Sequence, residues 1–154
     1  MALQRGSDGT APLTCVASAP ATAPAIALPD ALLRHVDVIT PNEHEVELLG
    51  GAASLLARGV GAVVITEGAR GARLVTREGE TRIAPYPVDP VDTTGAGDAF
   101  CGAVSARLAL DGGLAALPQA LRAGAVAGAL ATQVKGAVPS LPRWSAISAA
   151  LTRA

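Results

Sequence analysis

The sequence predicts an α/β domain with a largely parallel sheet flanked by helices, and three observations predict it. Short apolar runs rich in β-branched residues recur along the chain and alternate with helical segments. Half of the 154 residues are hydrophobic and 16% are charged, which excludes a disordered chain. Only 2% are aromatic, so we expect a core of small and branched aliphatic side chains. Strands that alternate with helices are typical of a parallel sheet.

The first half of the chain carries the clearest strand signals. We expect a flexible or partly extended lead-in over residues 1–28, with a short strand near 13–17, and the folded part over 29–154. Pro, Asn and Gly residues at the ends of apolar segments are helix start and stop signals. The expected helices are 31–35, 43–49 and 52–58, and the expected strands are 36–40, 62–66, 72–76 and 80–84. The last two strands are predicted to form a hairpin about a Glu-Gly turn.

The second half is predicted to be mainly helical. A short extended piece at 88–91 precedes the glycine-rich stretch 92–98. A long helix is expected from Ala99 to about residue 110, and residues 114–132 are expected to be mostly helical. A loop over 133–141 then leads to a final helix that begins at Pro142.

Charge and composition exclude several classes of protein. The net charge is −1 without a run of like charges, so nucleic acid is not an expected partner. The most apolar stretch, Ala123–Thr132, is too short to span a membrane, and the N-terminus lacks the apolar core of a signal peptide. Cys15 and Cys101 match no disulfide framework or metal motif. We therefore expect reduced thiols, a cytoplasmic location and no membrane partner.

The glycine-rich turn at Asp92–Asp98 carries the strongest chemical signal. Gly95 and Gly97 stand directly before a helix, where free backbone N–H groups and the helix dipole create a site for an anion. Asp98 has two interpretations. It caps the helix, or it accepts a proton from a hydroxyl that attacks a phosphate, which would explain a carboxylate beside an anion.

The segment Asp92–Phe100, DTTGAGDAF, resembles the second signature of the ribokinase (pfkB) family of carbohydrate kinases. Three other segments agree with this family in order and spacing. They are 36–49 with its N-x-x-E pattern, 64–71 with its T-x-G-x-x-G pattern, and KGAVPSLP at 135–142, which is typical of ribokinase itself. The resemblance covers roughly residue 36 to the C-terminus, and weakly the loop rich in Ala and Pro before it. It implies the C-terminal part of a ribokinase-like fold.

The resemblance implies an ATP-dependent sugar kinase that uses Mg²⁺, with ribose as the best single substrate. It makes Asp98 the catalytic base, and the amides of Gly95, Ala96 and Gly97 stabilise the transferring γ-phosphoryl group. Asn42 and Glu45 are implied to hold the Mg²⁺–phosphate assembly. Thr66, Gly68 and Gly71, together with Gly97, are implied to bind the nucleotide.

Ribokinase-like proteins also use a monovalent cation, commonly K⁺, beside the anion site. The resemblance implies that six oxygen ligands hold it here. They are the Asp92 carboxylate, the carbonyls of Thr94, Ala131, Val134 and Gly136, and the Ser140 hydroxyl. Lys135, next to this set, is either a phosphate contact or a solvated loop residue.

The sequence also departs from the family. Members are much longer, and their N-terminal half carries the lid and most sugar contacts. We therefore keep an alternative: a truncated, non-catalytic remnant that at most binds nucleotide or needs a separate N-terminal chain. A sheet without its other half is expected to expose an edge and an apolar face, which predicts that the chain self-associates into a homo-oligomer or is poorly stable. Glu67 stands where small or apolar residues are common, and Glu67 is expected to alter nucleotide choice or affinity.

Overall fold

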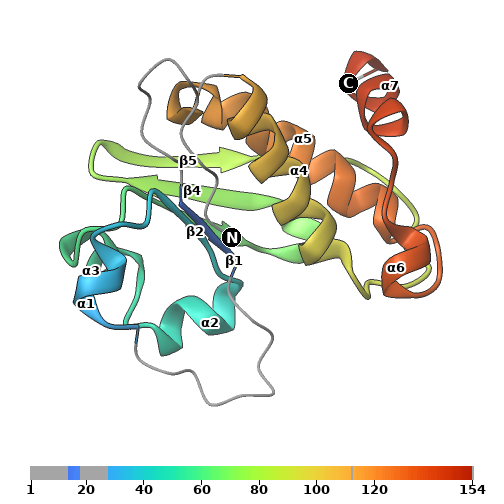
Figure 1. The fold of residues 1–154 in the computed structure, drawn as a ribbon. Coiled ribbons are helices and arrows are strands. Elements are labelled where there is room, and N and C mark those ends of the chain that lie inside the picture. The colour runs from blue at the N-terminus through green and yellow to red at the C-terminus, as the bar shows by residue number, and fades with distance from the viewer. Residues whose placement is uncertain (1–13, 18–27, 112, 154) are drawn as a thin grey trace. The chain divides into compact units, whose positions relative to one another are not determined.

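The computed structural model describes residues 14–17, 28–111 and 113–153 of a chain that divides into two compact units (Figure 1). The first unit consists of residues 1–67 and 72–82, and the second of residues 68–71 and 83–154. The expected boundary at residue 28 stays a prediction, because most of the lead-in lies outside the described residues.

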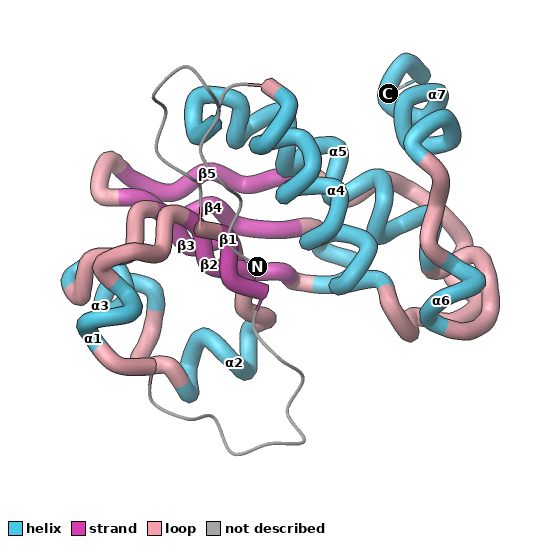
Figure 2. Tube along the Cα trace, in the orientation of Figure 1, coloured by secondary structure: helices cyan, strands magenta, loops and turns pink. Residues whose placement is uncertain are grey.

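A five-stranded sheet with the order β1-β2-β3-β4-β5 belongs to the first unit, apart from the last residue of β5 (Figure 2). Its strands are β1 (Cys15–Ala17), β2 (Val38–Thr40), β3 (Ala62–Thr66), β4 (Ala72–Thr76) and β5 (Gly79–Ile83). β1 runs parallel to β2, and β2 runs parallel to β3, with Ile39 opposite Val63. β3 and β4 are antiparallel, with Thr66 opposite Ala72.

The prediction of a mostly parallel sheet is not confirmed, because the sheet is mixed. Parallel neighbours need a long crossover connection, whereas a short turn forces the chain to reverse. β3 and β4 are joined only by Glu67–Gly71, and β4 and β5 only by Arg77 and Glu78. The hairpin that the sequence predicted therefore sets the antiparallel part of the sheet, while β1, β2 and β3 form the parallel part.

Three short helices and the parallel strands enclose the core of the first unit. The helices are α1 (Asp30–Leu33), α2 (Glu43–Leu48) and α3 (Ala52–Ala57). The core cluster consists of aliphatic side chains: Leu33, Val36, Ile39, Val46, Leu55, Leu56, Val60, Val63 and Ile65. Its members come from both strands and helices, so burial of this cluster holds the carboxyl ends of β2 and β3 in place.

The second unit is built on two long helices, α4 (Ala96–Leu110) and α5 (Leu117–Ala131), which pack along one another (Figure 1). Glycines on α5 allow the close approach: a Cβ on Gly124 would lie 2.6 Å from Val104 Cγ2, and one on Gly128 would lie 3.1 Å from the Ala96 oxygen. The rest of this core is mainly alanine, as the composition predicts.

Three shorter helices complete the second unit: η1 (Gly68–Arg70), η2 (Gly113–Ala116) and α7 (Trp144–Arg153), with a single turn, α6 (Ala137–Ser140). Three expectations need correction. α4 begins at Ala96 and not at Ala99, the expected loop over 133–141 contains α6, and the last helix begins two residues after Pro142. The first difference matters for the site, because it places Ala96, Gly97 and Asp98 in the first turn of α4.

One described helical stretch, Gly113–Ala131, is long and apolar enough to pass a test for a membrane span. Its mean hydropathy is 1.3, and half of the tested window is buried inside the structure. The buried residues of α5 include Leu121, Val126 and Ala127, and the helix packs on α4. Core helices pass the same test, so the stretch is explained by its place in the fold.

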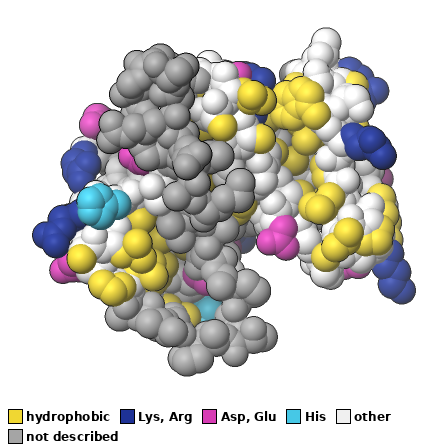
Figure 3. Space-filling model, in the orientation of Figure 1, with side chains coloured by type: hydrophobic (Ala, Val, Ile, Leu, Met, Phe, Trp, Pro, Cys, Tyr) yellow, Lys and Arg dark blue, Asp and Glu magenta, His cyan; other side chains and the backbone are white. Residues whose placement is uncertain are grey.

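Large apolar side chains remain exposed on the second unit. They are Val91, Leu110, Leu114, Val134, Val138, Leu141 and Trp144. Figure 3 shows apolar surface on this part of the molecule. Surfaces of this kind mark sites of association when they are continuous. The expected self-association of the chain stays a prediction.

Candidate active site

The start of α4 presents backbone donors without partners. Gly95 is the N-cap in the left-handed conformation, with φ +83°, and no side chain caps the helix. The Ala96 N–H donates to the Thr93 carbonyl at 3.2 Å, and the first helical bond runs from Ala99 N to the Gly95 carbonyl. Within the described part of the chain, the N–H groups of Gly95, Gly97 and Asp98 have no acceptor. These three N–H groups are available to bind an anion, whereas the Ala96 N–H already donates to the Thr93 carbonyl.

Only glycine fits at position 95. A Cβ there would lie 2.9 Å from the Ala137 Cα atom and 3.1 Å from the Ala137 carbonyl oxygen. The positive φ adds a second requirement, because side chains disfavour the left-handed region. The turn before α4 therefore packs directly on the backbone of α6.

Asp92 connects the same two segments by hydrogen bonds. Its Oδ1 accepts from the Thr94 N–H at 2.9 Å, and its Oδ2 accepts from the Gly136 N–H at 2.8 Å. A hydrogen bond from the Thr94 side chain, and then the two backbone donors, hold the pKa of Asp92 below its ordinary value. The N–H groups of Val91 and Asp92 both donate to the Thr132 carbonyl, at 2.7 and 2.9 Å.

The lowered pKa of Asp92 predicts a pH-dependent stability. A carboxyl group whose pKa is depressed on folding stabilises the protein above its unfolded pKa of about 3.9 and loses that contribution as pH falls through the folded value. We expect Asp92→Asn to unfold at a lower temperature than the wild type near pH 7, and the difference should shrink below about pH 4. Thermal unfolding between pH 3 and 7 measures it. A difference that stays constant down to pH 3 would contradict the role of the charged carboxylate.

The oxygen atoms implied to hold a monovalent cation come from neighbouring turns of the second unit. Ser140 is 3% exposed and donates its hydroxyl to the Ala137 carbonyl at 2.7 Å. The Gly136 carbonyl accepts from Ser140 N at 3.2 Å, and the Ala131 carbonyl accepts from Val134 N at 3.3 Å.

Both Asp92 oxygens accept hydrogen bonds from the backbone, so Asp92 holds the turn whether or not a cation is bound. All six groups offer hard oxygen atoms, the donors that an alkali cation prefers. Hydrogen bonds directly join Asp92, Gly136 and Ser140. Thr94 is bonded to Asp92, and Val134 is bonded to Ala131, but among these described residues no hydrogen bond links the Ala131–Val134 pair directly to the other four.

Asp98 lies in the first turn of α4 with an exposed side chain. No hydrogen bond or ion pair joins its carboxylate to the described part of the chain. The capping interpretation is therefore not supported as a hydrogen bond, although the carboxylate still lies at the positive end of the helix dipole. The Asp98 carboxylate and the free N–H donors beside it are therefore available to contact a ligand.

Asn42 and Glu45 form a reciprocal capping box in the first unit. The Asn42 Oδ1 accepts from Glu45 N at 2.9 Å, and the Glu45 Oε2 accepts from Asn42 N at 2.8 Å. Glu45 is 7% exposed, and its other carboxylate oxygen has no partner within the described residues. The N-x-x-E spacing was itself a capping-box signal. Both side chains therefore cap α2, in addition to their implied role in holding the Mg²⁺–phosphate assembly.

Thr66 lies next to Asn42 at the carboxyl ends of β3 and β2. Thr66 N donates to the Pro41 carbonyl at 2.9 Å, and Asn42 and Thr66 form a parallel bridge. Open α/β sheets bind ligands at this edge. The following turn is closed by Gly71 N donating to the Gly68 carbonyl at 3.1 Å. Only glycine fits at position 71, because a Cβ there would lie 2.1 Å from the Ile83 carbonyl oxygen.

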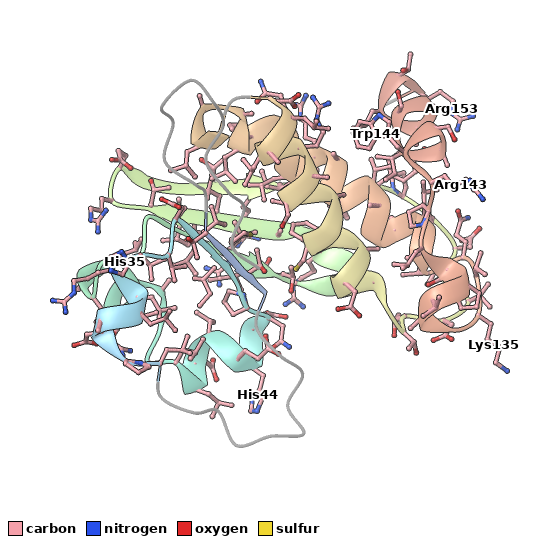
Figure 4. All side chains as sticks on the ribbon, in the orientation of Figure 1. His35, His44, Lys135, Arg143, Trp144 and Arg153 are labelled. Carbon is pink, nitrogen blue, oxygen red and sulfur yellow. The ribbon has the colours of Figure 1, made fainter. Side chains whose placement is uncertain are left out.

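The side chains of Lys135, His44 and Trp144 take no part in the hydrogen bonds described above. Lys135 is exposed and extends away from its unit, which favours the solvated interpretation (Figure 4). His44 is exposed on α2. Trp144 stacks under Arg107, whose guanidinium carbon is 5.2 Å from the ring centroid. No cluster of three or more His, Cys, Asp or Glu side chains suited to a metal occurs in the described residues.

Comparison with known families supports the resemblance and extends it. A model described as "pfkB family carbohydrate kinase" matches residues 2–144. The match begins well before residue 36, where the motif-based resemblance began, so the lead-in is part of the family sequence.

The curated relatives include proteins named ribokinase and proteins named fructokinase. The chain is 39% identical over 137 residues to the bifunctional ribokinase/ribose-5-phosphate isomerase A of Fructilactobacillus sanfranciscensis, covering 81% of this chain and 25% of that protein. It is 39% identical over 132 residues to the ribokinase of Staphylococcus aureus, covering 78% of this chain and 43% of that protein. The chain therefore spans less than half the length of these relatives.

Solved structures share the fold. A ribokinase from Thermotoga maritima matches with TM-score 0.79 and 29% identity over 91% of this chain and 49% of its own. A protein from E. coli described as ribokinase II, in complex with ATP and Mg²⁺, matches with TM-score 0.71 and 31% identity over 81% and 42%. A fructokinase double mutant from Vibrio cholerae, with fructose, ADP and a potassium ion bound, matches with TM-score 0.69 and 33% identity over 79% and 42%. The chain has a ribokinase-like α/β fold.

Proposed function

Because the chain belongs to the pfkB family of carbohydrate kinases, we propose that it takes part in transferring the γ-phosphoryl group of ATP to a sugar hydroxyl. One observation carries the proposal: free N–H donors of Gly95 and Gly97 begin α4, and the unpaired carboxylate of Asp98 follows them directly. Relatives with ribokinase names, 39% identical over 132–137 residues, support ribose as the sugar, and relatives with fructokinase names make fructose the second candidate.

Asp98 is proposed to accept the proton of the attacking sugar hydroxyl. Exposure on the first turn of α4 gives its carboxylate access to a ligand, and no neighbouring group competes for it among the described residues. A positioned base of this kind contributes roughly 10²–10⁴-fold to a rate. The free N–H groups of Gly95 and Gly97 donate to the phosphoryl oxygens as their charge develops. The Ala96 N–H, bonded to Thr93, holds the turn instead.

The nucleotide and its metal are proposed to use the residues implied by the resemblance. Thr66, Gly68 and Gly71 contact the nucleotide, and Asn42 and Glu45 hold Mg²⁺, with the free carboxylate oxygen of Glu45 as the fitting donor. Magnesium, when bound, neutralises phosphate charge. The E. coli neighbour bound to ATP and Mg²⁺ supports both ligands.

A potassium ion is proposed to bind among Asp92, Ser140 and the four carbonyls. The oxygen-only donor set and the potassium ion bound to the Vibrio cholerae neighbour support it. When bound, the cation strengthens the link between the turn before α4 and α6. We also propose that residues 29–154 correspond to the nucleotide-binding, C-terminal part of the family fold and that the protein works in the cytoplasm.

The test is ADP release by the purified chain with ATP, Mg²⁺ and K⁺, in the presence of ribose, fructose and other sugars. Turnover that depends on a sugar, highest with ribose, is the expected result. Binding of ATP without turnover would replace the proposal with the alternative of a chain that binds nucleotide but needs a separate N-terminal partner. Absence of both turnover and ATP binding would overturn the proposal.

A further inference from the structure

Glu67 is a buried carboxylate that the proposed mechanism does not use. Its side chain is 6% exposed, and it stands between Thr66 and Gly68, where the nucleotide is proposed to bind. Among the described residues, Glu45 is the other buried carboxylate, and the capping box explains it. A buried charge is costly unless it is paired, so Glu67 needs an explanation of its own.

The Glu67 carboxylate belongs to a chain of four charges along the antiparallel strands. Its Oε1 accepts from Arg73 Nε at 2.5 Å, and its Oε2 lies 3.8 Å from a guanidinium nitrogen of Arg82. Arg73 also donates to Glu80 at 3.3 Å. The other three side chains of this network are more exposed than that of Glu67: the exposed fraction is 28% for Arg73, 43% for Glu80 and 71% for Arg82. The two positive and two negative charges cancel, and the hydrogen bond that Arg73 donates to the Glu67 carboxylate raises the pKa of Arg73.

Close backbone packing fixes the end of the turn after Glu67, whereas its start is held by one backbone hydrogen bond, from Gly71 N to the Gly68 carbonyl. Gly71 lies against the Ile83 carbonyl, which fixes the end of the turn. At the start, Gly68 has φ +57°, and nothing lies within 4 Å of the position that a Cβ would take. Packing therefore does not restrict Gly68, and glycine is the most flexible residue of the backbone. A side-chain hydrogen bond also acts directly beside the start of the turn, where Arg73, on β4, donates to Glu67.

We infer that Glu67 is a positioning residue that, through Arg73, holds the start of the Gly68–Gly71 turn in the conformation that receives the nucleotide. The inference rests on the proposed function. A buried ion pair adds little net stability compared with an apolar pair of the same shape, but its directional hydrogen bonds restrict geometry. Ordering the turn before ATP arrives lowers the entropic cost of binding. The ordered turn strengthens the binding of ATP and leaves the rate of phosphoryl transfer unchanged.

The test compares Glu67→Gln, which keeps the shape and removes the charge, with Glu80→Gln at the exposed end of the same network. We expect Glu67→Gln to raise the KM and the Kd for ATP about tenfold, as expected when one charge-assisted hydrogen bond is weakened. Its kcat should stay within about twofold. Glu80→Gln should change neither constant more than about twofold. Amide hydrogen exchange over residues 68–71, measured without nucleotide, should speed up in Glu67→Gln only.

Arg73 provides a second pair of variants should Glu67→Gln fold poorly. Arg73→Met is expected to raise the Kd for ATP as Glu67→Gln does, whereas Arg73→Lys, which keeps the cation, should recover most of the affinity. A loss of thermal stability with an unchanged Kd would overturn the inference. Tighter ATP binding by Glu67→Gln would also overturn it, because the carboxylate would then repel phosphate. A wild-type chain that binds no ATP would refute the proposed function first, and this inference with it.

Discussion

Asp98→Asn is expected to reduce sugar-dependent ADP release at least about 100-fold while the chain stays folded. The amide cannot accept the proton of the attacking hydroxyl, although it has nearly the same shape as the carboxylate. The stability effect should be small, because Asp98 has no partner in the described part of the chain and loses only its interaction with the helix dipole, about 0.3–1 kcal/mol. Initial rates with saturating ATP and ribose, together with thermal unfolding, measure both quantities.

Asp89→Asn is the matched control for Asp98→Asn. Asp89 is also an exposed carboxylate of the second unit, but it lies in the extended stretch before the glycine-rich turn. Its substitution removes the same charge and should leave the rate within about twofold. Equal rates for Asp98→Asn and the wild type would show that Asp98 is not the base. ATP binding by Asp98→Asn should persist, which separates a defect in proton transfer from a defect in binding.

Gly95→Ala is expected to destabilise the chain by about 2–5 kcal/mol and to abolish turnover. Two effects add. The left-handed φ of +83° costs an alanine roughly 1–2 kcal/mol, and its Cβ would lie 2.9 Å from the Ala137 Cα atom, so the turn and α6 must separate. That movement also shifts the N–H donors away from the phosphoryl group. Denaturant unfolding measures the loss of stability, and ADP release measures the loss of turnover.

Gly97→Ala separates the effect of position 95 from a general effect of replacing glycine in this turn. Gly97 is helical, and no atom lies within 4 Å of the place where its Cβ would be. Alanine there should raise stability by up to about 1 kcal/mol through helix propensity. The prediction for Gly95 would be wrong if Gly95→Ala and Gly97→Ala were equally stable.

Much of the local structure could be predicted because its signals lie within short windows of sequence. The apolar run at 62–66 is strand β3, and the expected helix at 43–49 is α2, one residue shorter. The hairpin after residue 72 was also expected. A hairpin requires antiparallel neighbours, which is why the prediction of a mostly parallel sheet is not confirmed. The start of α4 was placed three residues late, since Gly95 and Gly97 weaken the helical pattern there.

Contacts between distant residues could not be predicted from the chain. Nothing in the spacing of Glu67 and Arg73 indicates that they form an ion pair. In the antiparallel register of β3 and β4, Ile65 lies opposite Arg73. Glu67 follows Ile65 by two residues, so the register brings its carboxylate within reach of the Arg73 guanidinium. The turn α6 was missed for a similar reason: it is a single turn that contains Pro139, and its contacts with Gly95 hold it.

The glycine-rich turn and the helix that begins beside Asp98 could be predicted from the sequence alone. The family resemblance and the proposed chemistry were based on the same residues. Those features depend on backbone conformational preferences and on the helix dipole, which act within a few residues. The contacts that hold this turn in place became visible only in the folded structure. The Asp92 carboxylate reaches the Gly136 N–H, 44 residues away, and Gly95 lies against Ala137. Packing of α4 on α5 creates these contacts, because it brings the two segments within hydrogen-bonding distance.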